Sequence, residues 1–148
     1  MDPPIFLSVA DVLSLHADTM SEEGGLGGLR DAALLESAVM MPQQQFGGSF
    51  LHPHLHEMAT AYLFHLANNH PFADGNKRVA AMAAFVFLDL NGYDLVARPK
   101  DFEKTVFGVA AGQLTKSDLT SKLESNIREH SRTFVRTRRK SQPWVTFH

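Results

Sequence analysis

Apolar residues recur along most of this chain every three or four positions, which is the spacing of an amphipathic helix. Residues that favour helix starts and ends divide this pattern into six segments. The predicted helices run from Ser8 to about Met20, from Asp31 to Met41, from Leu55 to Asn69, from Asn76 to Leu90, from Pro99 to Ala111 and from Thr115 or Ser117 to about His130. The sequence therefore predicts an all-α fold, a compact bundle of about six helices.

The segment from Asn76 to Leu90 is apolar on nearly all sides, so we expect it to be the buried central helix, with Gly92 just beyond its end. The glycine-rich stretch 24–28 predicts a loop. Residues 43–54, which combine glycine, proline and aromatic residues, predict an irregular loop or flap. No stretch shows sustained strand alternation. The segments 46–50 and 94–96 are short enough for a small hairpin, but we do not predict one there.

The composition is that of an ordinary globular protein, and it narrows the expected partners. The 148 residues carry a net charge of −2, but residues 128–148 alone carry +5 and the rest −7. We expect one domain over residues 1–130 and a basic, flexible tail over 131–148. The acidic body argues against a direct nucleic-acid binder, so nucleic acid is expected only indirectly, through a partner. The absence of cysteine and of any apparent leader or membrane segment predicts a cytoplasmic protein without membrane contact.

Nine consecutive residues, His70 to Arg78, combine a base, an acid, a glycine turn, an amide and two cations. A predicted helix follows at once, and a helix N-terminus offers free N–H groups and a positive dipole end to an anion. Gly75 permits the tight turn that directs those groups inward. Asp74 can hold Mg²⁺ against phosphates, and His70 can accept a proton near neutral pH. The pattern predicts a site for a nucleotide phosphate.

The segment His-Pro-Phe-Ala-Asp-Gly-Asn-Lys-Arg over residues 70–78 resembles the signature of the Fic/Doc (Fido) superfamily, His-x-Phe-x-(Asp/Glu)-Gly-Asn-(Gly/Lys)-Arg, at every fixed position. Doc-like proteins are also resembled by residues 24–31, 34–38, Pro42, 87–88 and 91–93. Lysine at position 77 is similar to the Doc branch, the toxins of type II toxin–antitoxin modules. The resemblance implies a compact helical Fic/Doc fold and transfer of part of a nucleoside triphosphate to a hydroxyl of a target protein.

The resemblance also implies a role for each motif residue. His70 would be the general base, and Asn76 and Arg78 would stabilise the charge that develops during transfer. ATP phosphates would bind at Gly75, Asn76, Lys77 and Arg78, with Mg²⁺ held by Asp74. Phe72 would anchor the segment in the core. As isolated residues, these side chains would more often be turn, capping or core residues, and it is their combination that favours a functional site.

Two residues bear on which part of the nucleotide is transferred. Family members that transfer AMP mostly have glycine where this chain has Lys77, and a second arginine where it has Ala81. The resemblance to Doc implies the other reaction, transfer of the γ-phosphate of ATP, with elongation factor Tu as the type of target and a cognate antitoxin as inhibitor. An adenylyl transferase with the same motif, or a catalytically idle module that binds the antitoxin, remains an alternative.

Other candidates are weaker. His52, His54 and His56 suggest a metal cluster, but Pro53 interrupts any helical spacing. His65 lies five residues before His70 and is expected to be structural. Glu124 lies in a stretch that is only faintly similar to the inhibitory motif of some Fic proteins, so we expect inhibition by a separate antitoxin rather than by the chain itself.

Overall fold

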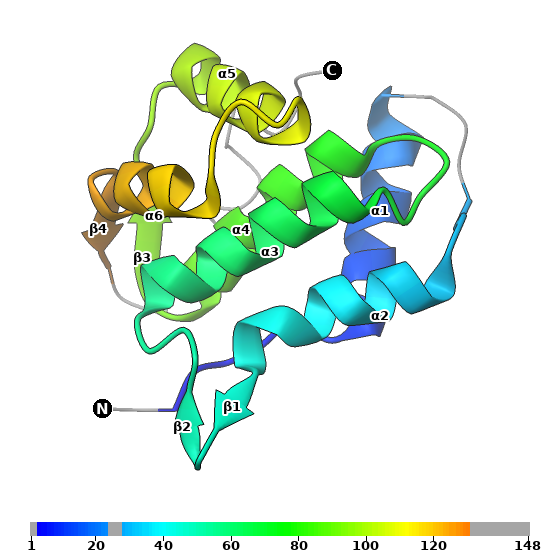
Figure 1. Cartoon of the computed structure of the whole chain (residues 1–148). Coiled ribbons are helices and arrows are strands. Elements are labelled where there is room, and N and C mark those ends of the chain that lie inside the picture. The colour runs from blue at the N-terminus through cyan, green and yellow to red at the C-terminus, as the bar shows by residue number, and fades with distance from the viewer. Residues whose placement is uncertain (1–2, 24–27, 131–148) are drawn as a thin grey trace.

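The computed structural model describes residues 3–23 and 28–130, and the chain over these ranges is mostly helical. Its six α-helices are α1 (Val9–Glu23), α2 (Ala32–Met40), α3 (Leu55–Asn69), α4 (Asn76–Leu90), α5 (Pro99–Ala110) and α6 (Lys116–Glu124). Helices α3 and α4 run side by side through the middle of the molecule, and α3 also packs against α2, α5 and α6 (Figure 1). The predicted tail 131–148 and all of the predicted loop 24–28 except Gly28 lie outside the described residues.

Side-chain hydrogen bonds cap the starts of α1, α2 and α6. Ser8 and Asp11 bond each other's backbone N–H groups at the start of α1, at 3.1 and 2.8 Å. Asp31 accepts from the backbone N–H of Leu34 at the start of α2 (3.0 Å), and Thr115 caps α6. Each such cap satisfies N–H groups that the first turn of a helix leaves without a partner, and contributes about 1 kcal/mol. These local signals explain why the predicted helix starts agree with the structure.

Helix α4 supplies much of the core. Eleven of its residues are buried, and it packs against α1, α3, α5 and the strand that follows it. The largest fully buried side chains of the described residues include Tyr62, Phe72, Phe85, Phe87, Leu35, Met58, Leu63 and Leu66. Gly92 follows α4 with φ of 92°, as the sequence predicts for the residue beyond a helix end. None of the helices in the described ranges has the length and apolar character needed to cross a lipid bilayer.

The prediction of an all-α fold is incomplete, because the structure also contains two small antiparallel sheets. Strands β1 (Gln45–Phe46) and β2 (Ser49–Phe50) form a hairpin, and β3 (Tyr93–Leu95) pairs with β4 (Ile127–Glu129). A one-turn 3₁₀ helix, η1 (Met41–Gln43), follows α2. Strands of two or three residues are too short to show an alternating pattern, so periodicity alone did not reveal them.

The last helix is shorter than predicted, because the chain after Glu124 turns into β4. Val96 N donates to Asn126 O and His130 N donates to Gly92 O, both at 2.7 Å. These bonds give the backbone of residues 126–130 partners in the strand segment after α4, which a continued helix would not reach. The β3–β4 sheet therefore ends α6.

Candidate active site

The segment between α3 and α4 carries the predicted motif. Helix α3 ends at Asn69, and His70 follows in a left-handed conformation with φ of 50° and ψ of 55°. Of the described residues other than glycine, His70 is the only one with a positive φ. A residue with a Cβ atom loses about 1–2 kcal/mol in this conformation, so neighbouring contacts must hold it there. The conformation leaves His70 exposed at the turn.

The far side of the segment is the N-terminus of α4. Gly75 precedes the helix with φ of 80°, which glycine adopts without strain. Because Gly75 has no side chain, it cannot cap the helix, and the first N–H groups of α4 can bond an external acceptor. The positive end of the helix dipole lies at the same place. This helix end is suited to an anion such as phosphate.

Asn76 connects the two halves of the segment. Its Oδ1 accepts a hydrogen bond from Phe72 N (3.0 Å), and its Nδ2 donates to Phe72 O (2.9 Å). The pair of bonds needs both the acceptor and the donor of an amide, which few side chains combine. Asn76 therefore shapes the segment through the backbone of Phe72, and its role in charge stabilisation stays a prediction.

A histidine of α1 supports the segment from the core side. The ring of His16 stacks on that of Phe72, with centroids 3.7 Å apart and planes 7° apart. His16 Nε2 also lies 2.8 Å from Asp74 O; because a carbonyl only accepts, this bond requires the proton on Nε2. Phe72 is only 2% exposed. Through these contacts Phe72 and His16 tie the segment to α1.

Residues 28–31, here called the strap, run beside the motif. The backbone N–H groups of Arg30 and Asp31 both donate to Pro71 O, at 2.7 and 3.0 Å, and Ala73 N donates back to the strap at 3.0 Å. The side chain of Arg30 also reaches the end of α3, where Nε donates to the carbonyl of residue 70 (2.7 Å) and Nη2 to that of residue 69 (3.1 Å). The strap thus holds the segment along its backbone.

The two cations of the motif lie in different surroundings. Arg78 is 8% exposed as a residue, and its Nη2 lies 3.7 Å from Asp74 Oδ1. Lys77 extends toward α5, where its Nζ lies 5.1 Å from the centroid of the Phe107 ring. Two cations at a helix N-terminus oppose the helix dipole, an arrangement that an anion at the same place would stabilise. The charges therefore favour an anionic ligand.

Asp74 is the carboxylate that could hold a divalent cation here. Its side chain is 46% exposed, and its Oδ1 accepts a hydrogen bond from Gly75 N (2.7 Å). Mg²⁺ is usually held by one or two carboxylates together with the phosphates of a nucleotide. A single, accessible carboxylate beside a helix N-terminus fits that mode of binding.

Comparisons with known proteins decide the family to which this geometry belongs. A family model described as "Fic/DOC family" matches residues 6–88, more than half of the chain. The chain belongs to the Fic/DOC family. It is 46% identical over 74 residues to the "Toxin Doc" of Mycolicibacterium smegmatis, and the aligned region covers 50% of this chain and 57% of that relative. It is 31% identical over 117 residues to the "Protein kinase doc" of Escherichia phage P1, and that aligned region covers 79% of this chain and 91% of the phage protein.

The match to the mycobacterial relative thus spans little more than half of that protein, whereas the match to the phage protein spans most of both chains. Both relatives are Doc proteins, so this chain is a Doc-type member of the Fic/DOC family, as the motif at residues 70–78 predicts. The roles assigned to the individual motif residues, and the binding of ATP and Mg²⁺, remain predictions.

The three histidines near the start of α3 do not converge on one point in this Fic/DOC fold. The rings of His54 and His56 stack with centroids 5.6 Å apart, and His52 turns instead toward Lys116. His56 Nε2 lies 3.7 Å from a carboxylate oxygen of Glu124. Glu124 therefore lies at the first turn of α3, at the opposite end of that helix from the motif, which leaves it no inhibitory contact there.

His52 and His65 both contact Lys116. Its Nζ lies 3.0 Å from the Nε2 atom of each ring, so both imidazoles accept from the ammonium. Burial, then the positive charge of Lys116, lowers the pKa of His65 to about 4. The same two causes lower the pKa of His52, and burial lowers that of Lys116. The structure thus gives His65 a structural role between α3 and α6.

A second cluster of ionisable side chains lies beside the β3–β4 sheet. His130 Nε2 is 3.0 Å from Asp89 Oδ1 and 3.5 Å from Asp94 Oδ1, and all three side chains are largely buried. In the described parts of the chain, this is the one set of three histidine or carboxylate side chains close enough to share a metal ion. Direct contacts of the ring with the two carboxyl groups account for the arrangement equally well, and they tie α4 to β3 and to the residue that follows β4.

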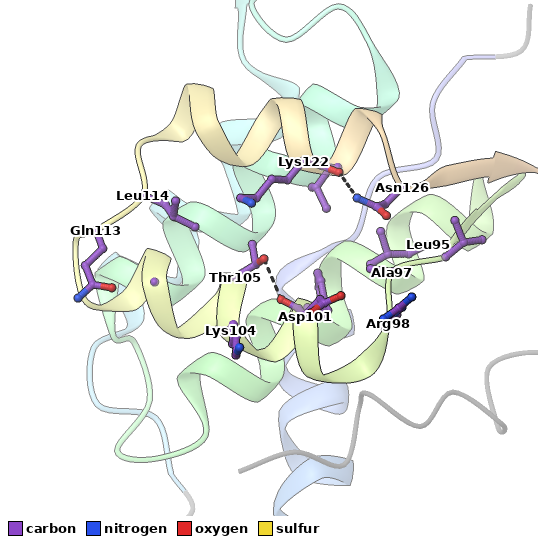
Figure 2. Close-up of a pocket in the computed structure, with 14 residues that line it drawn as sticks. Leu95, Ala97, Arg98, Asp101, Lys104, Thr105, Gln113, Leu114, Lys122 and Asn126 are labelled. Carbon is purple, nitrogen blue, oxygen red and sulfur yellow. Dashed lines mark hydrogen bonds between the residues drawn. The ribbon is translucent and has the colours of Figure 1, made fainter.

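A groove of about 660 Å³ lies between α5, α6 and β3, away from the motif (Figure 2). Its lining is mixed: it includes the apolar side chains Phe102, Leu114 and Leu123 and the cations Arg98, Lys104 and Lys122. No residue of the motif lines it. It is therefore separate from the candidate active site.

Three residues that support the Fic/DOC motif were missed by sequence reasoning. His16 and Arg30 act through backbone carbonyls 58 and 40 positions away, and Phe107 meets Lys77 from α5. A signal existed for Arg30 alone, because it belongs to the stretch before α2 that resembles Doc-like proteins. Nothing local distinguishes His16 or Phe107 from other residues of an amphipathic helix.

Proposed function

We propose that this protein is a toxin-type kinase that transfers the γ-phosphate of ATP to a hydroxyl group of a target protein. The observation that carries the proposal is the single segment in which an exposed histidine at the end of α3 adjoins an uncapped helix N-terminus with two cations. The name "Protein kinase doc" of the phage relative supports the kinase assignment.

The chemistry assigns a task to each side of the segment. His70 would accept the proton of the attacking hydroxyl group, a role that imidazole side chains often take in catalysis. The N–H groups at the start of α4, with Lys77 and Arg78, would bind and orient the phosphates. Mg²⁺ held at Asp74 would neutralise phosphate charge. The motif segment, braced by Asn76, would keep these groups at a constant separation.

Position 81 supports transfer of the γ-phosphate rather than AMP. Family members that transfer AMP resemble one another in a second arginine at this position, whereas this chain has Ala81, which is fully buried in α4. Lys77 then provides the additional positive charge of the site, and its contact with Phe107 gives that charge a defined place. Adenylyl transfer is the runner-up, and a module that only binds an antitoxin is a third possibility.

The names of the relatives also support partners. "Toxin Doc" suggests a toxin that is neutralised by a cognate antitoxin, and we propose the same control for this chain. We propose a translation factor of the elongation factor Tu type as target and the cytoplasm as site of action. Contact with nucleic acid would then occur only through the antitoxin.

The test is a transfer assay with ATP labelled at either the α- or the γ-phosphate, run side by side on a cell extract and on purified elongation factor Tu. His70→Ala removes the proposed base. The matched control is His54→Ala, because His54 is an exposed histidine at the other end of α3. A γ-labelled protein band that is lost with His70→Ala and kept with His54→Ala supports the kinase.

The other outcomes are equally informative. An α-labelled band assigns the protein to the adenylyl transferases and makes Lys77 a poor guide to the reaction. Transfer that is unchanged in His70→Ala refutes the role of His70 as base. If neither label is transferred although the protein binds its antitoxin, the binding module is the better description.

A further inference from the structure

The side chain of Arg30 bonds the two carbonyl groups on either side of His70. Its Nε donates to His70 O (2.7 Å) and its Nη2 to Asn69 O (3.1 Å). The Asn69 carbonyl belongs to the peptide unit before the Cα atom of His70, and the His70 carbonyl belongs to the unit after it. Because the relative orientation of these two planar units is what φ and ψ describe, one guanidinium holds both angles of His70.

The contact of Arg30 lies at the residue of the motif with a strained backbone. His70 has a left-handed backbone conformation, which a residue other than glycine rarely adopts without support from its surroundings. Glycine would relieve the strain at a helix end but would remove the imidazole. The planar, fork-shaped guanidinium provides two N–H donors in a rigid arrangement, and its charge also suits the negative end of the α3 dipole.

Further contacts hold Arg30 in place. Its own N–H and that of Asp31 donate to Pro71 O, the next carbonyl along the motif. Asn69 in turn donates from Nδ2 to the carbonyl of Leu34 in α2 (3.1 Å). Both peptide units beside His70 are therefore bonded to the strap, and the side chain of Asn69 adds a bond to α2; both elements lie far from the motif in sequence.

We infer that Arg30 is a positioning residue for His70. It keeps the histidine in its left-handed conformation and thereby fixes the direction in which the imidazole leaves the backbone, between the end of α3 and the start of α4. Arg30 itself makes no contact with the reacting atoms. The inference rests on the proposed function for its effect on catalysis, but its structural part is independent of that function.

Three variants test the inference. Arg30→Ala removes both donors, and Arg30→Lys keeps the charge without the planar fork. Arg128→Ala is the matched control, because Arg128 is an exposed arginine on β4, away from the motif. We expect kcat for γ-phosphate transfer to fall about 10- to 100-fold in Arg30→Ala and less in Arg30→Lys, because small displacements of a catalytic group are costly. The KM for ATP should change less than threefold, since the phosphate-binding groups lie on α4.

Two readouts separate positioning from a general loss of fold. Guanidinium ion at millimolar concentration should restore part of kcat in Arg30→Ala, because it can occupy the vacated position. The Cα and Cβ carbon chemical shifts of His70 in NMR spectra should move from left-handed toward extended values in Arg30→Ala and stay unchanged in Arg128→Ala. If Arg30→Ala does not fold, the same spectra and rates of Arg30→Lys decide the matter.

The results that overturn the inference are clear. Unchanged His70 shifts in a folded Arg30→Ala protein contradict it, whatever the activity. So does a wild-type kcat in that variant, or a fall in kcat with neither a change in the His70 shifts nor rescue by guanidinium. If the wild-type protein transfers no label at all, the proposed function fails, while the NMR comparison still decides whether Arg30 holds His70.

Discussion

The ammonium group of Lys77 lies 5.1 Å from the centre of the Phe107 ring, so the first turn of α4 and the last turn of α5 meet through a cation–π contact. Lys77 is the motif residue on which the proposed choice of transferred group depends. The aromatic ring holds its charge on the α5 side of the segment. Phe107 is 41% exposed, which leaves the contact accessible to solvent.

Replacing Phe107 with leucine should weaken ATP binding without disturbing the fold. The variant keeps an apolar side chain but loses the cation–π contact, which at an exposed position contributes about 0.5–1 kcal/mol. We expect KM for ATP to rise about two- to fivefold with little change in kcat. Phe46→Leu, on the exposed β1–β2 hairpin, is the control. An unchanged KM in Phe107→Leu would show that the aromatic ring does not position Lys77.

Replacing Asn76 with alanine should destabilise the protein as well as inactivate it. The change leaves both backbone groups of Phe72 without the side chain that bonds them, and we expect a loss of about 1–3 kcal/mol in the free energy of unfolding. Asn68→Ala is the matched control, since Asn68 makes one exposed bond within α3 (2.8 Å). Denaturant unfolding of both variants measures the difference. Equal stabilities would mean that the two bonds to Phe72 contribute nothing.

The contact of His52 and His65 with Lys116 should make the protein less stable in mild acid. The pKa of His65 in the folded protein is lowered to about 4, from an ordinary value of 6.5. A folded pKa below the unfolded one means that the unfolded chain takes up the proton first, so the contribution to stability is fully present above pH 6.5. It is lost as the pH falls from 6.5 toward 4.

His65→Gln tests this dependence, because glutamine can still accept from Lys116 but does not titrate. Urea unfolding between pH 7 and pH 4.5 should give a slope of unfolding free energy against pH that is smaller in the variant by up to about one bound proton. Identical slopes in the wild type and His65→Gln would contradict the prediction.

His130 should be important for the attachment of the β3–β4 sheet. Its ring lies between two buried carboxyl groups, those of Asp89 and Asp94, and removing the ring takes away a side chain that contacts both. We expect His130→Ala to lower the free energy of unfolding by about 3 kcal/mol. The variant Asp94→Asn, which keeps the ring and its contact with Asp89, should lose less. Thermal unfolding compares the two variants, and a His130→Ala protein as stable as wild type would exclude these contacts as stabilising.

Local signals predicted much of the fold. Helices α3 and α4 were predicted with the bounds that the structure has, because their apolar spacing is regular and Gly75 and Gly92 lie just outside α4. The caps Asp31 and Thr115 act within three residues, so the sequence alone reveals them. The end of α6 was wrong, since β4 forms only by pairing with a strand from another part of the chain.

The sequence by itself determined the helical character, the position of the motif and the family, because these depend on residues that are neighbours in the chain. Only the tertiary structure decided how the motif is held. His16, Arg30 and Phe107 reach it from three other segments, and their partners are backbone carbonyls and a lysine that packing brings near. The left-handed backbone of His70 was not predictable for the same reason. A sequence pattern reflects only residues that are neighbours in the chain, whereas the strained backbone of His70 is supported by contacts from distant segments.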